Sequence, residues 1–251
     1  MRSYLPSLVI ISSLLALVVF GASQLNYTWQ WGEIPQYLAE NEDGTWYRGA
    51  LIYGLTETVK ISSLSLASAL LGGLLLAGGR THLYWSLRIP SEAFFKMVRN
   101  TPLLVQLYVT YFIFGPILDL DRFWVAVLSL SAFHAAYLAP IFQSGLDSIP
   151  KGQAEAAQSL GLPKLNTYLE ILLPQALRVV LPACTNEAVN LIKNSALLSA
   201  IAIFELTTEG KDIVADTFMS FEIWLTVGAL YLLITIPLSS TAIYLEKRLK
   251  S

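Results

Sequence analysis

The sequence contains little charge, one cysteine and two histidines. Charged residues make up 14% of the 251 positions, whereas soluble domains average about 25%. Cys184 alone cannot form an intramolecular disulfide, and His82 and His134 lie far apart, without a cysteine or acidic cluster beside them in the sequence. Neither a Ser/His/Asp set nor a Gly-x-x-x-x-Gly-Lys-Ser/Thr loop is present. We therefore expect no catalytic site, no metal and no cofactor in this chain.

Apolar residues are abundant instead. They make up 55% of the chain, and several runs reach the roughly 20 residues that cross a bilayer core of about 30 Å. The sequence therefore predicts an all-α integral membrane protein, with membrane lipid and no nucleic acid among its partners. Its transmembrane helices, about six in number, are expected at residues 5–25, 49–79, 101–117, 123–144, 183–205 and 224–245.

The N-terminus has some features of a signal peptide. Arg2 precedes an apolar run that ends near small residues at 21–23. The apolar part of a signal peptide is usually about 7–15 residues, and this run continues to Leu25, so we favour an uncleaved membrane anchor. Aromatic and acidic residues follow at 26–48, a mixture that suits the outer membrane–water interface. We treat residues 1–48 as an N-terminal unit and 49–251 as the core.

The distribution of charge predicts the orientation. Cytoplasmic loops of membrane proteins carry an excess of Lys and Arg. Basic residues concentrate at Arg2, in a predicted loop at 80–99, at 145–182 and in the C-terminal tail, whereas 26–48, 119–122 and 205–222 are mainly acidic. This alternation fits six spans with both termini, and the segment 145–182, in the cytoplasm.

A polar bracket of two short helices is expected at about 148–174. Ser148 is a plausible cap for the start of the first helix. Gly161 suits the left-handed position that ends it, and Pro163 can open the next helix. Glu155 supplies one charge beside the small Ala156 and Ala157, which a partner could approach closely. The bracket therefore looks suited to docking.

The predicted fifth span contains a polar stripe. Charged groups within a bilayer cost at least about 2.5 kcal/mol each, so they should face a partner or a water-filled path. Two hypotheses stay open: a structural network at an interface between two copies, or a translocation path for a zwitterion. Gln106, in the third span, either borders the same path or belongs to a capped helix start. The stripe residues, spaced at intervals of three and four, are Asn186, Glu187, Asn190, Lys193 and Asn194.

The bracket also carries a family pattern. Glu155-Ala156-Ala157, Gly161, Ile171 and Leu173-Pro174 match the EAA motif of the permease subunits of ABC importers. The segments 99–107, 148–153, 173–178 and 191–195 resemble the polar amino acid uptake branch of that family, which carries amino acids of the histidine, glutamine, glutamate and arginine type. The resemblance covers about 50–245. After Ala136-Tyr137, where relatives usually carry an acidic residue and a basic-Gly pair, this chain has Pro140 and Gln143-Ser144-Gly145. Pro140 should loosen the fourth span.

The resemblance implies a five-helix permease core behind the N-terminal helix, in a bacterial cytoplasmic (inner) membrane. It implies a second permease, identical or homologous, and an extracytoplasmic binding protein that delivers a polar or charged L-amino acid. It also implies a dimer of ABC ATPase subunits, which bind ATP and Mg and hydrolyse the ATP, so this chain itself is no enzyme. In the family, Glu155, Ala156, Ala157, Gly161 and Pro163 correspond to the coupling helices that dock on the ATPase.

Two other classes of protein remain. One is a secondary transporter driven by an ion gradient, in which Glu187 and Lys193 would be the coupling site. Such transporters normally contain two matching repeats, which this sequence does not show. The other is a structural membrane scaffold. Neither has a use for the coupling motif. The residues do not decide which amino acid is carried.

Overall fold

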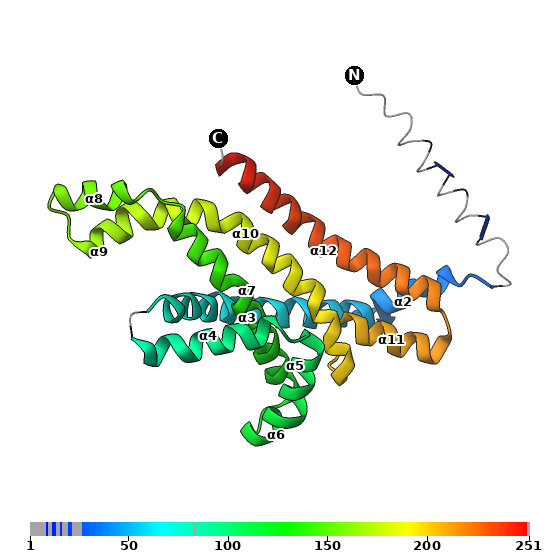
Figure 1. Cartoon of the computed structure of the whole chain (residues 1–251). Coiled ribbons are helices and arrows are strands. Elements are labelled where there is room, and N and C mark those ends of the chain that lie inside the picture. Colours follow the sequence, from blue (N-terminus) through cyan, green and yellow to red (C-terminus); the bar gives the residue numbers. More distant parts are fainter. Residues whose placement is uncertain are drawn as a thin grey trace.

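The computed structural model describes residues 27–82 and 84–249, together with isolated positions between 9 and 21. The predicted first span at 5–25, and with it the choice between a signal peptide and an anchor, lies largely outside the described residues. Figure 1 shows long helices crossing one another at an angle, with the short helices α8 and α9 projecting at one end of the bundle.

Helices account for most of the described chain. In chain order the elements are η1 (Trp31–Glu33), α2 (Ile34–Leu38), β1 (Ala39–Glu42), β2 (Thr45–Arg48), α3 (Ala50–Thr81), α4 (Trp85–Arg99), α5 (Leu103–Val109), η2 (Thr110–Phe114), α6 (Gly115–Leu118), α7 (Arg122–Asp147), α8 (Lys151–Ser159), α9 (Lys164–Asn166), η3 (Thr167–Leu172), α10 (Leu173–Asn194), η4 (Ser195–Ile201), α11 (Leu206–Thr217) and α12 (Ser220–Leu249). The segments η2 and η3 are π-helical turns, and η1 and η4 are 3-10 helices.

Three helices are long and apolar enough to cross a membrane alone: α3, α7 and α12. They confirm the predicted second, fourth and sixth spans. Two further spans are bent. α4 and the segment from α5 to α6 meet at 114°, and the helix at 164–201 meets α11 at 47°. The chain therefore has up to five spans within its described residues.

The prediction of a basic loop at 80–99 is wrong. α3 continues to Thr81, and α4 occupies most of the remainder. The apolar residues between the basic ones explain the helix: Val98 is buried, and Phe94 and Phe95 pack with it against Leu76. Burial of this apolar face stabilises a helix, and the basic residues of α4, Arg88, Lys96 and Arg99, remain exposed.

The helix that contains the predicted fifth span starts well before Ala183. The helix continues without a break from Lys164 to Asn194. Pro174 has no N–H for the helix ladder, and the π-helical turn η3 lies directly before it, where an altered hydrogen-bond register accommodates such a residue. The bracket's second helix and the predicted fifth span therefore belong to one continuous helix.

Ser148 does not cap the first helix of the bracket. Its Oγ donates to the carbonyl of Gly145 at 2.7 Å, and Ser148 ends α7. α8 starts after Pro150 without a side-chain cap. A serine can bond backward to a preceding turn as well as forward, and here the backward bond wins. α7 itself runs unbroken through Pro140.

The core is built around the contact between α3 and α7. A Cβ atom added to Gly73 would lie 2.8 Å from Cβ of Leu138, so only glycine permits this approach. Oγ of Ser131 donates to the carbonyl of Ser65 at 3.3 Å, across the same contact. Small and hydroxyl residues therefore hold the two helices together, as membrane helices commonly do.

Residues 27–48 pack against the start of α3, against α11 and against the start of α12. Antiparallel β1 and β2 pair Ala39 with Arg48, and Ile34 packs into a core with Leu51 and Ile223. The hydroxyl of Tyr27 donates to Oε2 of Glu222 at 2.5 Å. The segment is thus fixed to the start of α12.

Candidate coupling bracket and polar path

The bracket begins with α8 and turns at Gly161. Gly161 has φ +79°, which confirms the predicted left-handed conformation. Its N–H donates to the carbonyl of Gln158 at 2.9 Å, and that of Leu162 donates to Ala157 at 3.1 Å. This pair of bonds is the Schellman motif, which satisfies the last carbonyls of a helix. The elbow is therefore fixed by hydrogen bonds, and Pro163 precedes the next helix directly.

The outer surface of the bracket is available to a partner. Glu155 and Ala156 are exposed, whereas Ala157 is buried, and α8 packs against η3. The side chains of Leu160 and Leu165 are 82% and 66% exposed beside the elbow. Exposed apolar residues grouped on a projecting element commonly mark a protein interaction site. The bracket therefore combines one charge with an apolar rim.

The polar stripe on α10 faces a histidine on α7. Nδ1 of His134 lies 2.6 Å from Oε1 of Glu187, and His134 is fully buried. Nδ2 of Asn190 donates to Oε2 of Glu187 at 3.2 Å. Nδ2 of Asn194 lies 3.3 Å from Nε2 of His134. These contacts join three of the five stripe residues into one network.

The network is consistent in its hydrogen-bonding roles. An ionised carboxylate only accepts, so Nδ1 of His134 carries the proton and Nε2 accepts from Asn194. A buried carboxylate without donors is costly, and here both oxygens of Glu187 have one. Asn186 and Lys193 lie on the exposed side of α10. The stripe thus has a side tied to His134 and an exposed side, with Asn190 between them.

Gln106 braces the bend between α4 and α5. Its Nε2 donates to the carbonyl of Val98 at 2.8 Å and to the carbonyl and hydroxyl of Thr101 at 3.0 and 2.8 Å. These bonds satisfy carbonyls at the end of α4, which a 114° bend would otherwise leave unpaired. The amide of Gln106 is therefore engaged at the bend.

His134 is the residue that reasoning from the sequence missed. Its hydrogen-bonded acidic partner, Glu187, is 53 positions away in the sequence. A search for clusters along the sequence therefore cannot find the pair. The available signal was a titratable side chain inside an apolar span, because such a group needs a partner from another helix.

A second polar cluster lies where the sequence departs from the family pattern. Nη1 of Arg80 donates to Oε1 of Gln143 at 3.2 Å, and Nε of Arg80 pairs with Glu92 at 2.8 Å. The guanidinium also lies 3.5 Å from the centre of the Phe95 ring. A basic residue at position 143 would repel Arg80, whereas Gln143 accepts a bond from it.

The bundle of membrane-spanning helices, the projecting bracket and the polar stripe define a membrane permease. The model of the family described as binding-protein-dependent transport system inner membrane component matches residues 69–251. The chain belongs to this family. It is a multi-pass protein of a bacterial inner membrane, and the family works in general with an ATPase and a binding protein.

Individual relatives are also named as transport system permease proteins. The chain is 37% identical over 203 residues to the glutamine transport system permease protein GlnP of Escherichia coli (strain K12), covering 80% of this chain and 93% of the relative. It is 32% identical over 203 residues to the arginine transport system permease protein ArtQ of Bacillus subtilis (strain 168), with the same coverage.

Solved structures show the same fold. A crystal structure of an amino acid ABC transporter with histidines aligns with a TM-score of 0.72 and 30% identity, over 79% of this chain and 94% of that one. The MetNI methionine ABC transporter, in an inward-facing conformation, aligns with a TM-score of 0.64 at 19% identity, over 79% and 95%. The fold is therefore that of an ABC importer permease.

Proposed function

We propose that this chain is the permease subunit of an ABC importer that carries polar amino acids delivered by an extracytoplasmic binding protein. The observation that supports this most is the 37% identity to a glutamine permease, over 93% of that relative's length. The names of the relatives include glutamine, arginine and octopine permeases. An ion-driven secondary transporter is not favoured, because the family description specifies dependence on a binding protein.

The bracket would dock on the ATPase. Glu155 supplies an ionic contact, the exposed Leu160 rim supplies apolar contact, and the Gly161 elbow holds them at a fixed angle. The ATPase dimer, which binds ATP and Mg, would close when ATP binds. Its closure would move two such brackets, one from each permease. This chain would be non-catalytic. Because η3 and α10 continue the second helix of the bracket, movement there reaches the polar stripe directly.

The polar stripe would line the path of the amino acid. Asn186, Asn190 and Lys193 present amide and ammonium groups on its exposed side, which suit the carboxylate of a zwitterion. The carboxylate of Glu187 is already engaged by His134 and Asn190, so it is not free to pair with a cationic side chain. This arrangement favours a substrate with an uncharged amide side chain over one with a guanidinium.

Uptake into proteoliposomes tests the proposal. The permease is reconstituted with its ATPase inside and its binding protein outside, and labelled glutamine, glutamate and arginine are offered. We expect accumulation that requires both ATP and the binding protein, and that is highest for glutamine. Uptake driven by an ion gradient without ATP would instead establish a secondary transporter.

A further inference from the structure

An open groove runs along the outer face of α4. Its volume is about 590 Å³. Trp85 and Ile89 are 76% and 61% exposed within it. Each lining residue lies three or four positions from others in the set, so they occupy a single helical face: Trp85, Arg88, Ile89, Glu92, Ala93 and Lys96.

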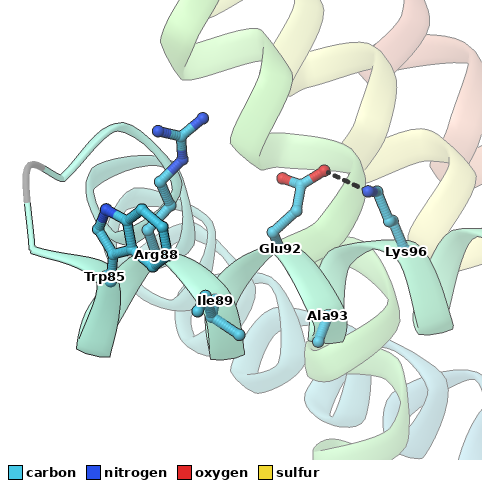
Figure 2. Close-up of a pocket in the computed structure, with 6 residues that line it drawn as sticks. All are labelled: Trp85, Arg88, Ile89, Glu92, Ala93 and Lys96. Atoms are coloured by element: carbon cyan, nitrogen blue, oxygen red, sulfur yellow. Dashed lines mark ion pairs between the residues drawn. The ribbon is translucent and has the colours of Figure 1, made fainter.

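The groove is divided into a charged rim and an apolar floor. Figure 2 shows Arg88, Glu92 and Lys96 extending to one side of α4, and Ile89 and Ala93 extending to the other. The indole of Trp85 closes one end. A ligand that fits both parts has an anionic group and an apolar body.

The rim carries surplus positive charge. Glu92 is bound by Arg80 at 2.8 Å and by Lys96 at 3.4 Å. The lining residues hold two cationic side chains, Arg88 and Lys96, and one carboxylate, a surplus of one positive charge; Arg80, which pairs with Glu92 from α3, adds a third cation beside the groove. Basic pockets of this kind beside membrane helices bind anionic lipid headgroups.

The position of α4 favours a lipid as the occupant. α4 packs on α3 and α7, and Figure 1 shows α10 and α12 on the far side of α3 from α4. The groove therefore lies on a helix that packs mainly on α3 and α7. A second copy of the chain is a poor occupant, because a two-fold contact would place the same face, with the same surplus charge, against itself.

We propose that this groove binds one anionic phospholipid of the bilayer. Its phosphate binds Arg88 and Lys96 while Glu92 stays paired with Arg80, and the first part of one acyl chain lies along Trp85, Ile89 and Ala93. The lipid braces α4 against α3, just before the bend that Gln106 holds. Membership of the family does not imply this site, and the proposed role of the polar stripe does not depend on it.

Native mass spectrometry of the purified full chain tests the proposal, with phosphatidylglycerol and phosphatidylcholine of identical acyl chains as probes. Attraction of about 1 kcal/mol per basic residue predicts a preference of roughly thirtyfold for phosphatidylglycerol when two residues contribute. The variant Arg88→Gln/Lys96→Gln should lose this preference. Arg178→Gln/Lys247→Gln removes equal charge from exposed positions elsewhere and should keep it.

Three results would overturn the proposal: equal binding of the two lipids, an equal loss in the control variant, or displacement of the lipid by inorganic phosphate alone. Trp85→Ala, which alters only an exposed side chain of the floor, provides a second variant if the double substitution does not fold. It should weaken both lipids. A disulfide between two copies of Ala93→Cys, formed at the same yield with or without lipid in a Cys184→Ser background, would show that a second copy fills the groove instead.

Discussion

Nδ1 of His134 lies 2.6 Å from Oε1 of Glu187, and the two residues join α7 to α10 inside the bundle. Both are buried. A hydrogen bond to a charged group contributes about 1.5–3 kcal/mol, so this contact stabilises the pairing of the two helices. It also engages an oxygen of Glu187 that a substrate in the proposed path could otherwise contact.

His134→Leu should change selectivity between substrates. Without the donor, Glu187 needs another hydrogen-bond donor, and the guanidinium of arginine can supply it. Because a bond of this kind contributes about 1.5–3 kcal/mol, we expect the ratio of arginine to glutamine uptake, measured as kcat/KM, to rise by roughly tenfold or more.

Ser131→Ala is the matched control for that substitution. Ser131 is also buried on α7, but its hydroxyl bonds to the carbonyls of Val127 and Ser65 rather than to α10. The control should lower both uptake rates together or leave both unchanged. If His134→Leu leaves the arginine to glutamine ratio unchanged, the pair has only a structural role.

Glu155→Ala should weaken docking on the ATPase without unfolding the permease. Glu155 is exposed, and substitutions at exposed positions usually change stability by less than about 0.5 kcal/mol. Removing one partner of a charge pair buried at an interface costs about 2–5 kcal/mol, so the affinity for the ATPase should fall by at least about tenfold. Surface plasmon resonance measures this affinity. Gln153→Ala, a substitution at an exposed position on the same helix, should change the affinity for the ATPase little. An equal loss of affinity in Gln153→Ala would show that Glu155 makes no specific contact.

Local residue patterns predicted local conformations well. Gly161 ends a helix in the left-handed region, because a glycine between an amphipathic turn and a Leu-Pro step has few alternatives. The apolar runs located α3, α7 and α12 for the same reason: length and hydropathy suffice to recognise a span.

The errors came from competition between neighbours and from contacts across helices. Ser148 could donate backward to a carbonyl of α7 or accept forward from an N–H of α8, and the sequence does not show which bond forms. The chain does not start a new helix at Ala183, because Pro174 and Pro182 are accommodated inside a continuous helix. The contact between His134 and Glu187 depends on how α7 and α10 pack, which no local pattern encodes.

Tyr27→Phe should loosen the N-terminal segment in a pH-dependent manner. The hydrogen bond to Glu222 raises the pKa of Tyr27 from 10.0 to about 12. A raised pKa means that the folded protein favours the protonated phenol, so the stabilisation is fully present below pH 10 and is lost as the pH rises toward about 12. The difference in Tm between the wild type and Tyr27→Phe should be constant from pH 7 to 10 and shrink above it. A difference that disappears below pH 10 would contradict this role.

The proposed coupling of the ATPase to transport is tested most directly at Gly161, where force from the ATPase would enter the chain. A Cβ at this position meets no atom within 4 Å, so a substitution acts only through the left-handed backbone, which disfavours alanine by about 1–2 kcal/mol and tolerates asparagine better. Gly152→Ala, also in open space but without a positive φ, is the control.

The measurement is the number of ATP molecules hydrolysed per amino acid transported by the reconstituted complex. We expect this ratio to rise in Gly161→Ala, to return toward the wild-type value in Gly161→Asn and to be unchanged in Gly152→Ala. A ratio that is the same in Gly161→Ala as in the wild type would show that the elbow does not transmit the force of the ATPase.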